Sequence, residues 1–213
     1  GLDRLRHRRM GSDAMMYQIK VTLNGIRPPI WRRLLVPGSL FLDDLHDVLQ
    51  IAVGWTNSHL HQFIAKGTFY GQPNPELDME MEQIDESRVR LDEVLRTKKD
   101  AMIYEYDFGD SWEHKIVLEK VVENAEGSLA SSCIAGARAC PPEDCGGIGG
   151  YASLLKIISK PSHPEHGEML EWLGDSFDPE RFDIAETNSV LARMKFRGLT
   201  TRSKATGRKR PAP

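Results

Sequence analysis

Apolar and polar residues alternate with a period of two near the start of the chain. Every second side chain from Met16 to Leu23 is apolar, and a similar alternation returns from Ile30 to Val36. A period of two is typical of a strand with one buried face. The Asn24-Gly25 turn signal between these segments favours an antiparallel pair, in which Arg32 and Arg33 point to opposite faces.

The pattern then changes to helical spacing and back to alternation. Apolar residues repeat three or four positions apart up to Val53, and Ser39 or Asp43 is expected to cap the start of this helix. Gly54 suits the end of the helix. From Trp55 to Ala65 the alternation returns, which predicts a third strand. The order at the start of the chain is therefore strand, strand, helix, strand.

A β-hairpin is predicted over residues 100–122. Apolar side chains alternate in both of its arms, and Gly109-Asp110 suits a two-residue turn with glycine first. Three shorter features lie between the third strand and this hairpin. They are a loop over residues 67–75, an acidic mobile segment over residues 77–86 and one helical turn over residues 91–95.

The second half of the chain is predicted to be helical. Apolar residues at helical spacing occur in three segments, residues 151–159, 165–173 and 187–196. Strands that cluster early and helices that cluster late favour the α+β class over alternating α/β. We therefore expect a mixed or antiparallel sheet that starts β-β-α-β, followed by a β-hairpin and C-terminal helices.

Basic residues are concentrated at the two ends of the chain. We expect a single domain over residues 16–196, with a disordered extension over residues 1–15 and a basic disordered tail over residues 197–213. Twelve of the 28 Lys and Arg residues lie within residues 1–10 and 193–213, which leaves a body with 16 basic and 30 acidic residues. Because phosphate contacts need Lys and Arg, nucleic acid is expected to bind only through the tails, unless these are simply solvated.

Several classes of protein are disfavoured by the composition. No apolar run approaches the roughly 18 residues that span a bilayer, so no membrane partner is expected. The start of the chain carries arginines without an apolar segment behind them, unlike a secretory signal. Three cysteines are an odd number, which disfavours a disulfide framework. We therefore expect reduced thiols and a cytoplasmic location.

All three cysteines, Cys133, Cys140 and Cys145, lie in one stretch rich in glycine and proline. Three thiolates and one imidazole make a tetrahedral zinc site, so this stretch predicts a structural zinc ion. The other interpretation is that the cysteines are small buried hydrophobic residues in a loop. The fourth ligand would come from one of five histidines, His59, His61, His114, His163 and His166.

A second group of candidates surrounds the predicted hairpin. His61, Asp107 and His114 combine imidazoles with a carboxylate, the groups that bind a catalytic metal or transfer protons. The alternative is that Asp107 serves the turn and the histidines are hydrogen-bonded core residues. Glu143 and Asp144 either bind a cation or cap the start of a helix. The predicted binding cleft gathers Trp31, Arg32, His59, His61, Asp107, Asp110, His114, Glu143 and Asp144.

Several phrases of the sequence resemble one family. They are PPIWRRLLVP, LDDLHDVLQIAVGW, HLHQF, YDFGDSWEHKIVLE, CIAGARACPPEDCGGIGGY and FDPERFD. They are similar to a bacterial and archaeal family named after the third open reading frame of an Agrobacterium root-inducing plasmid, from about Met16 to Met194. The resemblance implies an αβ-roll-like α+β domain, a fixed PPED-x-GG phrase at residues 141–147 and cysteines that members carry or lack. Family labels that mention plasmids, transposons or a resolvase imply an association with mobile elements.

Function is predicted from the residues and the resemblance together, because no phosphate-loop, dinucleotide or serine-nucleophile motif occurs. The leading prediction is a non-enzymatic, cytoplasmic binding or interaction module with a structural zinc site, whose partner is an unknown protein or small ligand. The first alternative is a metal-dependent hydrolase or nuclease that uses His61, Asp107 and His114. The second is a DNA-associated accessory protein linked to a resolvase or to transposition.

Overall fold

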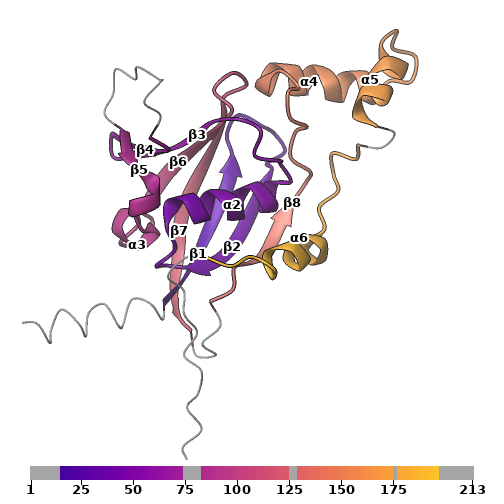
Figure 1. The fold of residues 1–213 in the computed structure, drawn as a ribbon. Helices are drawn as coiled ribbons and strands as arrows, with labels where there is room; N and C mark the ends of the chain where they lie inside the picture. The colour runs from indigo at the N-terminus through magenta and orange to yellow at the C-terminus, as the bar shows by residue number, and fades with distance from the viewer. Residues whose placement is uncertain (1–14, 74–82, 125–128, 175–176, 197–213) are drawn as a thin grey trace, which may run out of the picture.

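The computed structural model describes residues 15–73, 83–124, 129–174 and 177–196, arranged as Figure 1 shows. Within these residues, eight strands form one sheet in the order β5-β4-β3-β6-β7-β1-β2-β8. The strands are β1 (Met15–Leu23), β2 (Trp31–Pro37), β3 (His61–Ala65), β4 (Thr68–Gly71), β5 (Gln83–Asp85), β6 (Ala101–Tyr106), β7 (Trp112–Glu123) and β8 (Ser132–Ala137). The described helices are α2 (Leu42–Val53), the 3-10 turn η1 (Glu86–Arg88), α3 (Leu91–Val94), α4 (Gly147–Ile158), α5 (His166–Leu173) and α6 (Ile184–Leu191).

The core lies between the sheet and α2, which crosses one face of the sheet (Figure 1). Every second residue of β1, β2 and β6 is buried on that face, and Ile19, Leu34 and Tyr104 are fully enclosed. Strands β4 and β5 pair in parallel, and the other neighbours pair antiparallel. The predicted α+β class is confirmed, with its β-β-α-β start, its hairpin and its late helices.

The start of α2 is capped differently from the prediction. Phe41 occupies the N-cap without a side-chain hydrogen bond, so neither predicted residue, Ser39 or Asp43, is the N-cap. Asp43 lies in the first turn, where its Oδ1 accepts from the amide of Asp44 at 3.0 Å. The first amide of the helix, that of Leu42, donates to the carbonyl oxygen of Val89 at 3.0 Å. A backbone acceptor from a distant segment therefore satisfies one of the amides of the first turn that have no partner within the helix.

The segments around β3 and β4 also differ from the prediction. Strand β3 begins at His61 rather than at Trp55. Trp55 and Thr56 bond to Pro141 and Glu143. The amides of Ser58 and His59 donate to the side-chain hydroxyl of Tyr106 instead of to a neighbouring backbone. The predicted loop over residues 67–75 contains β4, which pairs with β3. Of the predicted mobile segment, residues 83–85 form β5 and residue 86 begins η1, whereas the rest lies outside the described residues.

The predicted hairpin is formed by β6 and β7, but its turn has five residues, Asp107 to Ser111, rather than two. Asp107 and Ser111 adopt positive φ angles of 57° and 53°. The amide of Ser111 donates to the carbonyl oxygen of Asp107 at 2.6 Å, which closes the turn. The side chain of Asp107 is thereby held at one end of the sheet.

The three C-terminal helices are confirmed, with shifted bounds: α4 starts at Gly147 rather than Tyr151, and α6 ends at Leu191. Helices α4 and α5 extend beyond one end of the sheet, whereas α6 packs beside β8 (Figure 1). The predicted extension over residues 1–15 lies outside the described residues except for Met15, and the predicted tail lies wholly outside them. Within the part of the chain that the structure describes, no helix has the length and apolar character that crossing a bilayer requires.

Candidate functional site

Three segments that are distant in the sequence meet at one end of the sheet. They are residues 55–59 before β3, the turn between β6 and β7, and the PPED-x-GG phrase. The indole Nε1 of Trp55 donates to the carbonyl oxygen of Pro141 at 2.8 Å. The amide of Gly146 donates to Asp110 Oδ2 at 3.1 Å. These long-range bonds bring the polar candidates of three sequence phrases together.

Both carboxylate oxygens of Glu143 are occupied. Oε1 accepts from the Tyr106 hydroxyl at 2.5 Å, and Oε2 accepts from the hydroxyl and the amide of Thr56 at 2.6 and 3.2 Å. Burial, followed by the bond to Glu143, raises the pKa of Tyr106, so this hydroxyl stays a protonated donor. Glu143 therefore positions the loops and is not a free ligand.

Asp144, next to Glu143, lies beside His59 and Asp107. The Nε2 atom of His59 is 3.0 Å from Asp144 Oδ1 and 3.7 Å from Asp107 Oδ2. Among the described residues, this is the one group of three or more His, Cys, Asp or Glu side chains whose ligand atoms all lie within 4.8 Å of one another. Helix capping, the alternative role predicted for the two acids, is wrong, because Gly146 occupies the N-cap of α4 without a side-chain bond.

Both aspartates of this group have left-handed backbone conformations, with φ angles of 57° at Asp107 and 59° at Asp144. Aspartate tolerates this region better than most residues, because its short side chain bonds to nearby amides. Asp107 is 8% exposed, and its Oδ1 accepts from the amides of Gly109 and Asp110 at 3.0 and 3.3 Å. Its other oxygen, Oδ2, faces His59.

The glycines of the PPED-x-GG phrase allow the chain to pass close to the hairpin turn. A Cβ atom on Gly147, whose φ is +66°, would lie 2.7 Å from the carbonyl oxygen of Asp110. Any other residue would therefore be strained and would push the turn away. This close contact explains why residue 147 is a glycine.

A groove of about 420 Å³ opens between α4 and α5 next to Asp144. The residues that line it are Asp144, Cys145, Gly150, Ser153, Leu154, Ile157, Glu165, Glu168, Met169 and Trp172. Trp172 is 52% exposed and also lines an adjoining hollow of about 470 Å³ along Pro141, Pro142 and Glu143. The two hollows meet at this indole, beside residues 141–144, the PPED segment.

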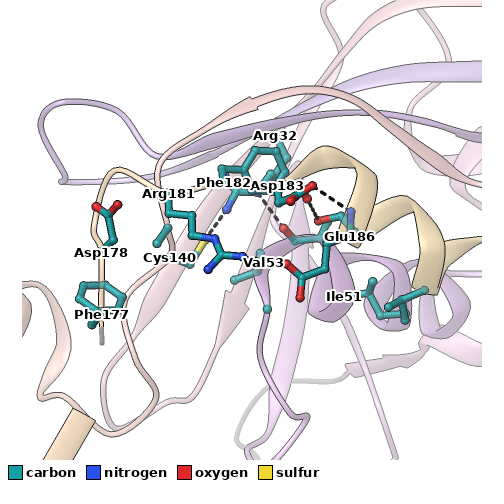
Figure 2. Close-up of a pocket in the computed structure, with 15 residues that line it drawn as sticks. Arg32, Ile51, Val53, Cys140, Phe177, Asp178, Arg181, Phe182, Asp183 and Glu186 are labelled. Atoms are coloured by element: carbon teal, nitrogen blue, oxygen red, sulfur yellow. Dashed lines mark hydrogen bonds and ion pairs between the residues drawn. The ribbon is translucent and has the colours of Figure 1, made fainter. Parts of the chain in front are cut away.

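Arg32 lies in a different pocket, of about 460 Å³, between α2 and α6 (Figure 2). The residue is 2% exposed, and its guanidinium donates to the carbonyl oxygens of Ala52, Trp31 and Ala137 at 2.7, 2.8 and 3.0 Å. The ring of Phe182 stacks on it, with 3.6 Å between the ring centre and Cζ. Its contacts are those of a structural residue that joins β2, β8 and α2, so its predicted place in the cleft is wrong.

Trp31 precedes Arg32 on β2 and therefore points to the opposite face of the sheet. On that face, Lys20 Nζ and Arg33 Cζ lie 5.0 and 5.1 Å from the centre of its ring. Trp31 and Arg32 thus cannot share one cleft. Of the predicted cleft, the structure gathers His59, Asp107, Asp110, Glu143 and Asp144, and it places Trp31, Arg32, His61 and His114 elsewhere.

The predicted catalytic set is not brought together. His61 and His114 lie on the same face of the sheet, but β6 separates their strands, so about 10 Å lie between the strand axes. His61 Nε2 contacts both oxygens of the buried Glu86 at 3.0 Å, and its ring stacks on His46 at 3.5 Å. His114 is 2% exposed and bonds to the carbonyl oxygen of Trp112. Both histidines are core residues, and only Asp107 reaches the site.

The three cysteine sulfurs do not lie within reach of one ion. Cys133 is buried on β8, and its amide donates to the side chain of Asn188 at 2.7 Å. Cys140 accepts a 3.6 Å contact from Arg32, and Cys145 lines the groove. Burial raises the pKa of all three thiols, to about 12 for Cys145. The three-thiolate site is therefore not formed in this arrangement, and zinc binding by the chain stays a prediction.

Apart from Asp144 and Cys145, the residues that line the groove were not among the candidates predicted from the sequence. Trp172, Glu165 and Glu168 lie in or next to a short helix, α5, that buries none of its residues. The signal available in the sequence was Trp172, which follows Glu168 by one helical turn and so places a large aromatic side chain at the border of the acidic side of this helix. A surface helix of a stable fold normally has a polar outer face.

Comparisons with known proteins identify the family. The family model described as plasmid pRiA4b ORF-3-like protein matches residues 15–186. An uncharacterised protein of Sinorhizobium fredii is 38% identical over 180 residues, which cover 84% of this chain and 91% of that protein. The crystal structure of a protein of unknown function from Methanosarcina mazei is 36% identical, with a TM-score of 0.72, and the match covers 81% of this chain and 97% of that one. The chain therefore belongs to the family of plasmid pRiA4b ORF-3-like proteins.

Proposed function

We propose that the protein is a binding module that takes a basic, partly apolar segment of a partner protein into the groove between α4 and α5. The observation that carries the proposal is Trp172, which is 52% exposed on the wall of this groove. Tryptophan is enriched among the few residues that dominate the binding energy of interfaces, where its large surface becomes covered by the partner.

The charge of the groove indicates the chemistry of the partner. Asp144, Glu165 and Glu168 supply carboxylates, and the described residues that line the groove include no Lys, Arg or His. A lysine or arginine of the partner would be attracted to these acids. A cation over the face of the indole would gain about 0.5–2 kcal/mol more. Apolar side chains of the partner would cover the part of Met169 that is still exposed.

The extent of the hollow favours a peptide segment over a small molecule. The groove and the adjoining hollow share Trp172, so a bound chain could continue from α4 and α5 along the PPED segment. The acidic lining disfavours nucleic acid as the occupant of this groove, because phosphates would be repelled. The proposal is thus a protein-interaction role, carried by a surface that is acidic and apolar at once.

The proposal is tested with three blocked dipeptides that differ in one charge: acetyl-Leu-Lys-amide, acetyl-Leu-norleucine-amide and acetyl-Leu-Glu-amide. Binding is followed by NMR, through the indole N–H signal of Trp172 and the amides of α5. The lysine peptide is expected to bind at least about tenfold more tightly than the glutamate peptide, a difference of about 1.4 kcal/mol. The norleucine peptide should lie between them.

Matched variants separate the groove from the rest of the surface. Trp172→Leu and Glu168→Gln are expected to weaken the lysine peptide at least about threefold. Glu171→Gln is the control, because Glu171 is also exposed on α5 but does not line the groove. Equal affinity for the three peptides, or an equal loss in the Glu171 variant, would show that the groove does not select a cationic segment.

A further inference from the structure

We propose that His59, Asp107 and Asp144 form a binding site for one divalent transition-metal ion. This site is separate from the cysteine stretch and goes beyond the proposed peptide binding. It uses one side chain from each of the three segments that meet at the end of the sheet. An ion there would tie the loop before β3, the hairpin turn and the PPED segment to one another.

The distances fit ligands that face a shared point. Ligand atoms held about 2.1 Å from one ion stand about 3.0 Å apart at a right angle and up to about 4.2 Å apart on opposite sides. His59 Nε2 lies 3.0 Å from Asp144 Oδ1 and 3.7 Å from Asp107 Oδ2. Both separations fall within that range, and the three ligand atoms lie within 4.8 Å of one another.

The orientation of His59 supports a metal ligand rather than an ordinary ion pair. Its Nε2 atom is buried and makes no hydrogen bond. Asp144 Oδ1 lies 3.0 Å from this nitrogen, which is within hydrogen-bonding distance. Because no hydrogen bond forms, the two groups must lack the alignment that one needs. A buried ring nitrogen beside two carboxylates is costly unless something satisfies it. A cation between the three groups would satisfy the nitrogen and both carboxylates at once.

The ligands are also held in place by other contacts. Oδ1 of Asp107 is fixed by the amides of Gly109 and Asp110, so Oδ2 stays turned toward His59. The residue before Asp144, Glu143, is anchored by Tyr106 and Thr56. Such outer contacts orient ligands and increase metal affinity. The residues are thus positioned before any ion arrives.

The donor set indicates the kind of ion. One imidazole nitrogen with two carboxylate oxygens suits Mn²⁺, Fe²⁺, Co²⁺ or Zn²⁺ better than Ca²⁺ or Mg²⁺, which prefer oxygen ligands alone. Three protein ligands leave positions for water or for a group of a bound partner. Because Asp144 also lines the groove, the ion would lie at the groove's edge, where it offsets the charge of two of the nearby carboxylates.

The test uses Co²⁺ and the full chain after treatment with a chelator. Isothermal titration calorimetry is expected to show one Co²⁺ ion per chain, and the visible spectrum is expected to show weak bands of nitrogen and oxygen ligands. An intense near-ultraviolet band from thiolate ligands would instead place the ion on the cysteines and overturn the proposal. The absence of stoichiometric binding would overturn it as well.

Two variants locate the ion. His59→Gln and Asp144→Asn are expected to weaken Co²⁺ at least about tenfold, and unchanged melting curves of the metal-free proteins would show that they still fold. His163→Gln is the matched control, because His163 also neighbours a carboxylate, that of Glu165 at 3.9 Å, but belongs to no three-ligand group among the described residues. Equal affinity in the His59 and His163 variants would place the ion elsewhere. Dipeptide binding through Trp172 is measured without metal, so it can succeed or fail independently.

Discussion

The Nε atom of Arg32 donates a 2.7 Å hydrogen bond to the carbonyl oxygen of Ala52, in the last turn of α2. The last carbonyl groups of a helix accept no hydrogen bond from within the helix, and they lie at the negative end of the helix dipole. A buried guanidinium at this point satisfies one of them and is itself stabilised by the dipole. The same guanidinium donates to the carbonyl oxygen of Ala137 on β8. Because Arg32 itself lies on β2, it links α2 to both strands.

The replacement Arg32→Met is therefore expected to destabilise the fold strongly. It removes charge-assisted bonds to three carbonyls, of which the bond to Ala52 is fully buried, and the free energy of unfolding should fall by about 2–4 kcal/mol. Urea unfolding measures this loss. The control is Arg33→Met, because Arg33 pairs with Glu119 on the more exposed face, where such a pair is worth about 1 kcal/mol or less. Similar losses in both variants would contradict the structural role of Arg32.

Two buried histidines predict how stability depends on pH. Burial lowers the pKa of His46 and of His114 from 6.5 to about 4. In the unfolded chain both take up a proton near pH 6.5, whereas in the folded chain they stay neutral until about pH 4. The unfolded state thus binds more protons between these values, so stability falls as the pH is lowered through this window. Each histidine should contribute a loss of up to about 3 kcal/mol.

The measurement is the free energy of unfolding in urea at several pH values from 7.5 to 4.5. His114→Phe removes one of the two titrations and keeps an aromatic ring beside Tyr104 and Trp55. The variant can be less stable at pH 7.5, but its slope against pH should be smaller by up to about 1.4 kcal/mol per unit. An unchanged slope would mean that His114 takes up its proton at the same pH in the folded and the unfolded chain, which would contradict a pKa lowered by burial.

The elements of the fold could be predicted because their signals are local. The alternation in β1 and β2 placed Arg32 and Arg33 on opposite faces, and the helical spacing placed α2. The role of Arg32 was not predictable in this way, since its acceptors come from residues 52 and 137, which the fold brings to it. Local patterns thus identified which residues are buried but not what a buried polar residue bonds to.

The candidate site shows the same limit. Alternation placed His59 and His61 on one face of a single strand, but β3 begins only at His61. His59 therefore lies in a loop beside Asp144, whereas His61 enters the core beside Glu86. Asp107, Asp110 and Asp144 were predicted as candidates from their residue type alone, because carboxylates can bind a metal ion or transfer protons. Which histidine joins them depends on where a strand starts, and before His61 long-range bonds to the PPED segment and to the Tyr106 hydroxyl take the place of strand pairing.

Two neighbouring glycines at the start of α4, Gly149 and Gly150, are expected to respond in opposite ways to replacement by alanine. A Cβ atom on Gly150 would lie 1.8 Å from the carbonyl oxygen of Cys145, whereas a Cβ atom on Gly149 would meet nothing within 4 Å. Gly150→Ala should therefore force the PPED segment away from α4 and cost about 2–3 kcal/mol. Gly149→Ala should be neutral or stabilise the helix by up to about 1 kcal/mol, because alanine restricts the unfolded chain.

Thermal unfolding of the two variants measures this difference, and NMR shows its local effect. If the close contact at Gly150 positions the PPED segment, the alanine there should also shift the amide signals of Asp144 and of Thr56, which is bonded to Glu143. The Gly149 variant should leave both signals in place. Equal stability of the two variants would mean that the segment can move away from α4 at little cost. In that case Asp144 would not be held beside His59 by the backbone, and the proposed metal ion would have to order this segment itself.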